Sequence, residues 1–150
     1  MAFKSKMMGR DAVMRKLRDL VPDAEKEAAK AQIEAAEELA VAIKSRAPVG
    51  RDEGSGDYRA SIRGGRIAEA PERAVIGAQR SKDPNATGVF ANHKWRWLEF
   101  GTAERFKKSG ASTGQMPAQP HIFPTFRQYR KKIRRKVATA INRAVRKARG

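Results

Sequence analysis

The sequence predicts one domain of mixed α and β structure, in which two long helices enclose a region of short strands. Three observations support this: an Ala-rich stretch of helix formers ends at Arg46, short apolar runs separated by turn residues follow it, and an amphipathic stretch lies near the C-terminus. A chain of 150 residues has the usual size of a single domain, so we expect residues 1–150 to form one unit.

The first long helix is predicted for Asp23 to Arg46. Asp23 can cap its N-terminus, strong helix formers fill its length, and Pro48 follows its end. Small apolar residues recur along it at helical spacing, which permits close approach of another helix or a sheet. A shorter amphipathic helix, Asp11 to Leu20, is predicted before it for packing against the core or a partner.

Two short strands are predicted between the long helices. Tyr58 to Ile67 alternates weakly between apolar and polar residues, Ala74 to Ala78 is a short apolar run, and Glu69 to Glu72 supplies the turn between them. Val89 to Phe100 is compatible with a strand and with a short helix, and the sequence does not decide between the two.

Polar, Gly- and Ser-containing stretches are predicted to form flexible loops at about residues 50–57, 80–92 and 103–118. The first contains several glycines but lacks the Gly-Lys-Ser/Thr ending and the preceding apolar strand of a phosphate-binding loop. We therefore expect no nucleotide site there.

The second long helix is predicted from about Pro124, a good first-turn residue, to Lys147. Its large apolar residues recur every three or four positions and form one continuous stripe for packing. The stripe consists of Phe126, Tyr129, Ile133, Val137, Ile141 and Val145.

Positive charge is concentrated in the last third of the chain. The net charge is +17, and 14 Lys and Arg with no acid follow Glu104, so residues 1–104 carry only 17 − 14 = +3. The cations of the last helix lack acidic partners one turn away, so an external anion would relieve their crowding. The side chains predicted to contact a polyanion or a protein partner are Arg127, Arg130, Lys131, Arg134, Arg135, Arg143 and Arg146.

The stretch from Trp97 to Thr102 places one carboxylate, Glu99, among large aromatic residues. An aromatic run is normally core, so we expect a buried strand or short helix in which Glu99 is paired with an Arg, because an unpaired buried charge is costly. The residues predicted to form this structural motif, together with two prolines that lead into the last helix, are Trp97, Glu99, Phe100, Gly101, Thr102, Pro120 and Pro124.

Catalysis has little support in the sequence. There is no Cys, and the only histidines, His93 and His121, do not have the spacing of metal ligands. Ser61 has no base that the sequence identifies, and the acids near residues 52–57 lie beside arginines, which indicates surface salt bridges. We therefore expect no catalytic, metal or cofactor residues. No apolar run approaches the length of a membrane span.

Nucleic-acid binding by a free basic protein is the alternative that the composition favours. The C-terminal helix could lie along phosphates, and Trp95 and Trp97, flanked by Lys94 and Arg96, could stack on bases. Against this alternative, no helix-turn-helix, zinc-binding or RNA-binding signature is present.

Three blocks resemble a known family. They are similar, in this order, to blocks of the head–tail joining, or tail-completion, proteins of the long-tailed siphophages. The first block is Ala47-Pro48-Val49 with Tyr58-Arg59-Ala60-Ser61-Ile62, the second is Leu98-Glu99-Phe100-Gly101-Thr102, and the third is Gln119-Pro120-His121-Ile122-Phe123-Pro124-Thr125. The chain departs from the family pattern at Tyr58, which stands where the pattern has Leu, and at His121, which stands where it has Phe.

The resemblance implies an α+β unit, with a small, mostly antiparallel sheet packed by the Ala-rich and the basic C-terminal helices. It also implies a structural virion protein of the neck, made in the host cytoplasm and assembled as a ring, with six copies favoured, around the DNA channel. The expected partners are other copies of the chain, adjoining neck and tail proteins and the genomic DNA. No enzyme activity, cofactor or membrane is implied.

Overall fold

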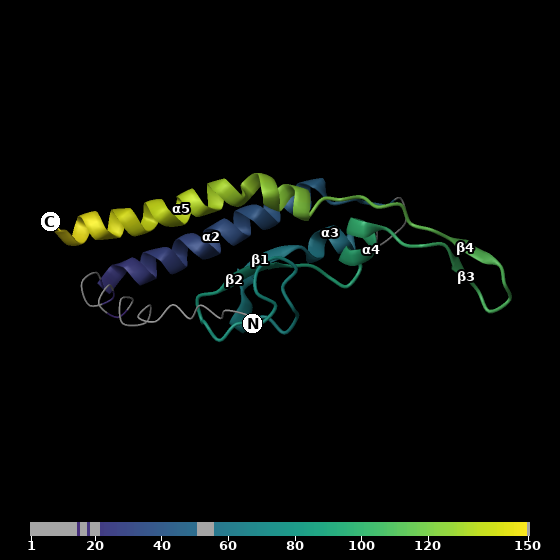
Figure 1. Ribbon diagram of the computed structural model, residues 1–150, viewed down its shortest axis with the longest axis horizontal. Coiled ribbons are helices and arrows are strands. Elements are labelled where there is room, and N and C mark those ends of the chain that lie inside the picture. Colours follow the sequence, from purple (N-terminus) through teal and green to yellow (C-terminus); the bar gives the residue numbers. More distant parts are fainter. Residues whose placement is uncertain (1–14, 16–17, 19–21, 51–55, 150) are drawn as a thin grey trace, which may run out of the picture.

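The computed structural model describes residues 15, 18, 22–50 and 56–149. Two long antiparallel helices, α2 (Pro22–Arg46) and α5 (Phe123–Arg149), lie side by side, and a small sheet lies on the other side of α2 (Figure 1). The α+β class and both long helices are confirmed. The helix predicted for Asp11 to Leu20 lies outside the described residues, apart from Arg15 and Arg18, which are helical.

The sheet consists of β1 (Arg63–Arg66) and β2 (Thr87–Phe90), which pair in antiparallel register with Gly64 opposite Val89. The single bridge from Ile76 to Val89 extends it. The strand predicted for Ala74 to Ala78 is therefore wrong beyond that bridge, because Gly77 takes a φ of 107° and turns the chain away.

The strand predicted for Tyr58 to Ile67 is wrong over most of its length. The segment contains the helix α3 (Asp57–Ser61), then β1, then the 3-10 helix η1 (Ile67–Glu69). Tyr58 and Ile62 are both buried and lie four residues apart, a spacing that fits one face of a helix as well as alternate positions of a strand.

The remaining short elements lie where the sequence was undecided or predicted loops. Val89 to Phe100 contains the end of β2 and then α4 (Trp95–Phe100), so it is both strand and short helix. The predicted loop 80–92 contains β2, and the predicted loop 103–118 contains a hairpin of β3 (Arg105–Phe106) and β4 (Ser112–Gly114).

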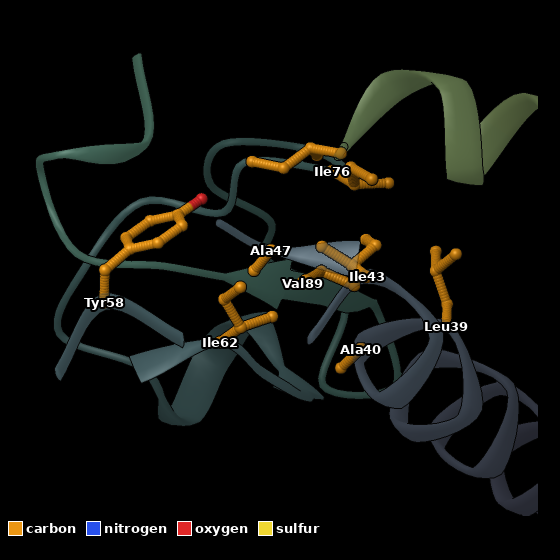
Figure 2. Close-up of a cluster of buried hydrophobic side chains, with 9 residues drawn as sticks. Leu39, Ala40, Ile43, Ala47, Tyr58, Ile62, Ile76 and Val89 are labelled. Atoms are coloured by element: carbon orange, nitrogen blue, oxygen red, sulfur yellow. The ribbon is translucent and has the colours of Figure 1, made fainter. Parts of the chain in front are cut away.

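The core lies where the C-terminal half of α2 meets the sheet and the start of α5. Figure 2 shows its side chains converging from α2, α3 and the strands. The cluster consists of Leu39, Ala40, Ile43, Ala47, Tyr58, Ile62, Ile76, Val89 and Ile122.

Small residues let the sheet approach the backbone of α2. A Cβ atom on Gly64 would lie 2.4 Å from the carbonyl carbon of Ala36, so β1 touches the helix where neither residue has a large side chain. On this side Ala36 and Ala40 are buried, and on the α5 side Ala31 is also buried. The Ala-rich composition of α2 therefore follows from its position between two layers.

Candidate functional site

Glu99 is the centre of the motif predicted from the sequence. Its side chain is only 3% exposed, and its carboxylate accepts three backbone hydrogen bonds from the stretch that leads into α5. Oε2 accepts from the amides of His121 at 2.7 Å and Ile122 at 2.9 Å, and Oε1 accepts from the amide of Phe123 at 2.9 Å. A short helix, α4, thus fixes one carboxylate against three consecutive amides.

This carboxylate caps the N-terminus of α5. The carbonyl of Ile122 accepts the amide of Phe126 at 2.9 Å, so Ile122 is the capping residue and the amides that Glu99 binds are among those left without a partner inside the helix. The first turn of α5 contains no acid of its own, and Glu99 supplies the negative charge that favours a helix N-terminus. The predicted pairing of Glu99 with an Arg is therefore wrong, because backbone donors satisfy the buried charge.

His121 and Tyr58 extend this polar cluster into the core. His121 Nδ1 lies 2.7 Å from the carbonyl oxygen of Gln119 and 3.3 Å from Glu99 Oε2, and both are acceptors, so Nδ1 carries the proton. Nε2 then accepts the Tyr58 hydroxyl at 2.6 Å. Burial, and secondarily the charge of Glu99, raise the pKa of Tyr58, which keeps this hydroxyl protonated as a donor.

Both residues of this pair were missed as site residues by the sequence reasoning. Tyr58 and His121 lie 63 positions apart, and the structure brings their rings to a centroid distance of 5.5 Å. The signal that could have identified them is that both are polar replacements of apolar residues in the blocks that resemble the phage family. Two such replacements in one chain favour mutual contact in the core.

The end of the motif closes the base of the β3–β4 hairpin. The amide of Thr102 donates to the carbonyl of Met116 at 2.9 Å, and the amide of Met116 donates back to Thr102 Oγ1 at 2.9 Å. Gly101 takes a φ of 75°, and a Cβ atom there would lie 2.8 Å from the carbonyl oxygen of Met116. A glycine is therefore required where the two sides of the hairpin base meet.

The aromatic residues of the motif are more exposed than predicted. Trp97 is 44% exposed and Phe100 is 64% exposed, so the expectation of a buried aromatic run is wrong for these two residues. Phe100 stacks on Phe123 at a centroid distance of 6.0 Å, and Trp95 lies against both rings. Of the two lead-in prolines, Pro120 is exposed and Pro124 lies in the first turn of α5.

The predicted polyanion-contacting cations lie on the exposed surface of α5, and two of them, Arg135 and Arg143, border a groove that α5 forms with α2. All seven are exposed, and none forms an ion pair or side-chain hydrogen bond with another residue that the structure describes. They are Arg127, Arg130, Lys131, Arg134, Arg135, Arg143 and Arg146, which we call the basic face.

Two other cations of α5 point toward α2 and are paired. Lys136 contacts Glu38 at 2.5 Å and Glu34 at 3.3 Å, and Lys132 contacts Glu38 at 3.3 Å. The hydrogen bond with Glu38 raises the pKa of Lys136, and that same bond lowers the pKa of Glu38. Part of the charge crowding expected on α5 is therefore relieved within the fold, which the sequence did not reveal.

The structure does not bring the motif and the basic face together into one site. Glu99 binds the start of α5, whereas the basic face extends from Arg127 to Arg146, about 29 Å along the helix at about 1.5 Å per residue. The motif thus anchors the start of α5, whereas the cations of the basic face are exposed to solvent.

Other candidates considered from the sequence have structural roles or no assembled site. Ser61 Oγ donates to the carbonyl of Tyr58 and accepts the amide of Asn92, and His93 packs edge-on against Trp97. Within residues 22–50 and 56–149, no group of three or more His, Cys, Asp or Glu has the arrangement of a metal site. No helix in the described parts of the chain is both long and apolar enough to cross a membrane.

Comparison with known proteins identifies the family. No curated protein and no solved structure matches the chain. A family model described as "HK97-gp10_like: Bacteriophage HK97-gp10, putative tail-component" matches residues 11–101, which is more than half of the chain. The match includes the first two of the three similar blocks as far as Gly101, whereas residues 119–125 lie beyond it. The chain belongs to the HK97-gp10-like family of bacteriophage tail components.

Proposed function

We propose that the protein is a structural component of the phage head–tail connector that completes the tail by forming a ring, with six copies favoured, around the DNA channel. In this role it joins head to tail and acts without enzyme activity or a cofactor. Its partners are other copies of itself, adjoining neck and tail proteins and the DNA that passes through the channel. Its place in the cell is the host cytoplasm during assembly and the virion neck afterwards.

The observation that supports this role is the unpaired basic face of α5. Seven exposed cations on one helix, without partners among the described residues, repel one another unless an anion lies nearby. In a ring, this face can point at DNA phosphates or at acidic surfaces of the adjoining proteins. Family membership as a tail component favours anionic partners that are found in a phage particle.

The salt dependence of DNA binding tests the electrostatic part of this proposal. If six or more cations contact phosphates, affinity should fall by about 10³-fold or more between about 50 and 200 mM salt. The measurement is a titration of duplex DNA by fluorescence anisotropy at several salt concentrations. A flat response would exclude DNA as the partner of the basic face and leave acidic neck proteins.

A matched pair of triple variants separates the basic face from net charge. The first triple variant removes three cations at helical spacing from the basic face: Arg127→Gln, Arg130→Gln and Arg134→Gln. The second removes three exposed cations from the loops on the sheet side: Arg73→Gln, Arg80→Gln and Lys82→Gln. We expect the first triple to reduce the slope of log affinity against log salt by about three and the second to leave it nearly unchanged. Equal losses would indicate that only net charge matters.

The alternative function, a free nucleic-acid-binding protein, predicts a different oligomeric state. A ring-forming component should give a discrete oligomer in light scattering at moderate salt, whereas the alternative should give a monomer or dimer that binds DNA strongly. The stacking part of the alternative is limited by the structure: Trp95 already packs against Phe100 and Phe123, which leaves Trp97 as the exposed tryptophan.

A further inference from the structure

The β3–β4 hairpin projects from one end of the molecule, away from the helices (Figure 1). Every residue from Ala103 to Gln115 is exposed, and the two strands pair with each other and with no other strand of the described chain. A hairpin of two strands is marginally stable on its own in water. Its shape is nevertheless fixed at the base by the Thr102–Met116 hydrogen bonds.

The hairpin and its base carry exposed aromatic rings beside unpaired cations. Phe106 is 63% exposed and Phe100 is 64% exposed. Arg105, Lys107 and Lys108 are also exposed and form no ion pair with any described residue, while the neighbouring Glu104 is hydrogen-bonded to Ser112. Exposed aromatic side chains and Arg are enriched at protein-binding surfaces.

A second surface of the same chain has the complementary chemistry. A shallow groove of about 670 Å³ between α2 and α5 contains Val41, which at 66% is the most exposed large apolar side chain of the described residues. Glu34, Glu37 and Glu38 line the groove beside it, together with Lys132 and Lys136, which pair with Glu34 and Glu38, so the charge offered to a partner is that of Glu37. Glu37 is exposed and has no ion-pair partner in the described chain. We call this surface the α2 groove.

The two surfaces cannot meet within one molecule. The hairpin extends away from α2 (Figure 1). The groove is lined by residues 34–45 in the middle and C-terminal part of that helix. A contact between two different surfaces of the same chain is head-to-tail, and such contacts close into a ring when the rotation between subunits permits it.

We propose that the hairpin of one copy docks in the α2 groove of the next copy, with Phe106 against Val41 and Lys107 and Lys108 beside Glu37. This inference rests on the proposed ring, and it names the contact that would build it. Complementary charge would set the direction of docking, and the aromatic–aliphatic contact would hold the hairpin in place. In this contact the hairpin packs against the neighbouring copy, whereas in its own chain it pairs with no other strand.

Disulfide trapping tests this contact directly, because the chain contains no Cys. Phe106→Cys and Val41→Cys proteins are prepared separately, mixed and oxidised under mild conditions. We expect a covalent dimer in the mixture and little in either protein alone. Phe106→Cys mixed with Ala68→Cys, which places the second thiol at an exposed position outside the groove, is the matched control and should not form dimers.

Charge reversal provides an independent readout. Lys107→Glu with Lys108→Glu should abolish the oligomer seen by light scattering, and adding Glu37→Lys should restore it. Circular dichroism of each variant checks that the fold is retained. Dimers formed equally with the Ala68→Cys control, or charge variants that assemble normally, would overturn the hairpin contact.

The outcome for the unmodified chain separates this inference from the proposed ring. An oligomer without the specific cross-link would overturn the hairpin contact and leave the ring to be built by other surfaces. A chain that stays monomeric at all concentrations, with and without DNA, would overturn self-assembly and this contact with it.

Discussion

The two long helices have different relations to the rest of the molecule. α2 lies between α5 and the sheet, so both of its sides are buried and small residues such as Ala36 and Ala40 dominate it. α5 is covered on one side only, where large residues such as Phe126, Tyr129 and Ile133 pack against the core, and its other side carries unpaired cations. α2 therefore organises the fold, whereas α5 leaves a row of cations exposed, which is the surface that we propose for a partner.

The helices also differ in how their ends are stabilised. α2 has acids in its first turn and Lys44 and Arg46 in its last, so its own sequence supplies charges that favour both ends. α5 takes the anion for its N-terminus from Glu99, more than 20 positions earlier. The start of α5 thus depends on tertiary structure, and the following predictions test this difference.

The largest effect is expected for Glu99→Ala. The substitution leaves the buried amides of His121, Ile122 and Phe123 without their acceptor, and each buried donor without a partner costs about 1–3 kcal/mol. We expect the free energy of unfolding to fall by about 3 kcal/mol or more, measured by urea denaturation. Glu104→Ala, at an exposed position, is the control and should have little effect. A small loss for Glu99→Ala would show that α5 starts without this cap.

The next largest effect is expected for Gly64→Ala at the contact between β1 and α2. The added methyl group would meet the backbone of Ala36 at 2.4 Å, and a helix backbone cannot move aside as a flexible side chain can. We expect a loss of about 1–3 kcal/mol in thermal unfolding. Gly65→Ala is the matched control, because its nearest neighbour would lie 3.7 Å away. Equal losses would mean that the sheet is not pressed against α2.

An effect of similar size that depends on pH is expected for Tyr58→Phe. Below about pH 10, loss of the hydroxyl leaves a buried His121 nitrogen unpaired and should cost about 1–3 kcal/mol. The pKa of Tyr58 is raised in the fold, so the hydroxyl loses its proton in the unfolded chain before it does so in the folded protein as the pH rises past about 10. Above that pH the contribution of Tyr58 to the free energy of unfolding declines by up to about 1.4 kcal/mol per pH unit. Unfolding of both proteins at increasing pH should show their difference shrinking. A difference that stays constant would contradict the raised pKa.

The smallest effects are expected on α5 and should differ in sign. Lys136→Gln removes the ion pairs with Glu34 and Glu38 and should lower stability by no more than about 1 kcal/mol, because these groups are partly exposed. Arg134→Gln relieves repulsion from Arg130 one turn away and should leave stability unchanged or raise it by about 0.2–0.5 kcal/mol. Added salt should reduce both effects. Losses of the same size and sign would mean that Arg134 has a partner in the fold.

The long helices could be predicted from sequence because their signals are local. Apolar residues repeat with the period of a helix along α5, and Pro48 limits α2. The short elements between them carry weaker signals, since spacing that fits a strand also fits one turn of helix at Tyr58 and Ile62. The hairpin had a detectable signal in Gly110 and Gly114, which both take positive φ, but the polar composition around them favoured a loop.

The site was predictable only in part: Glu99 was identified, whereas Tyr58, His121 and the hydrogen bonds of the cluster were not. Glu99 was identified as a buried carboxylate that needs donors, and the donors are the backbone amides of His121, Ile122 and Phe123. Almost every residue has a backbone amide, so the sequence cannot show which amides bind a given carboxylate. The division of the α5 cations into paired and unpaired sets likewise depends on which of them come within reach of the acids of α2. Only the fold determines that Lys132 and Lys136 meet acids and that the basic face does not.

One continuous stretch, from Leu98 to Thr102, holds both the hairpin base and the first turn of α5. Leu98 binds the amide of Gln119 at 2.7 Å, Glu99 binds the next amides along the lead-in, and Thr102 binds Met116. These bonds connect the hairpin base directly to the start of α5. If a neighbouring copy binds the hairpin as proposed, the position of the hairpin would also set the orientation of α5 and its basic face.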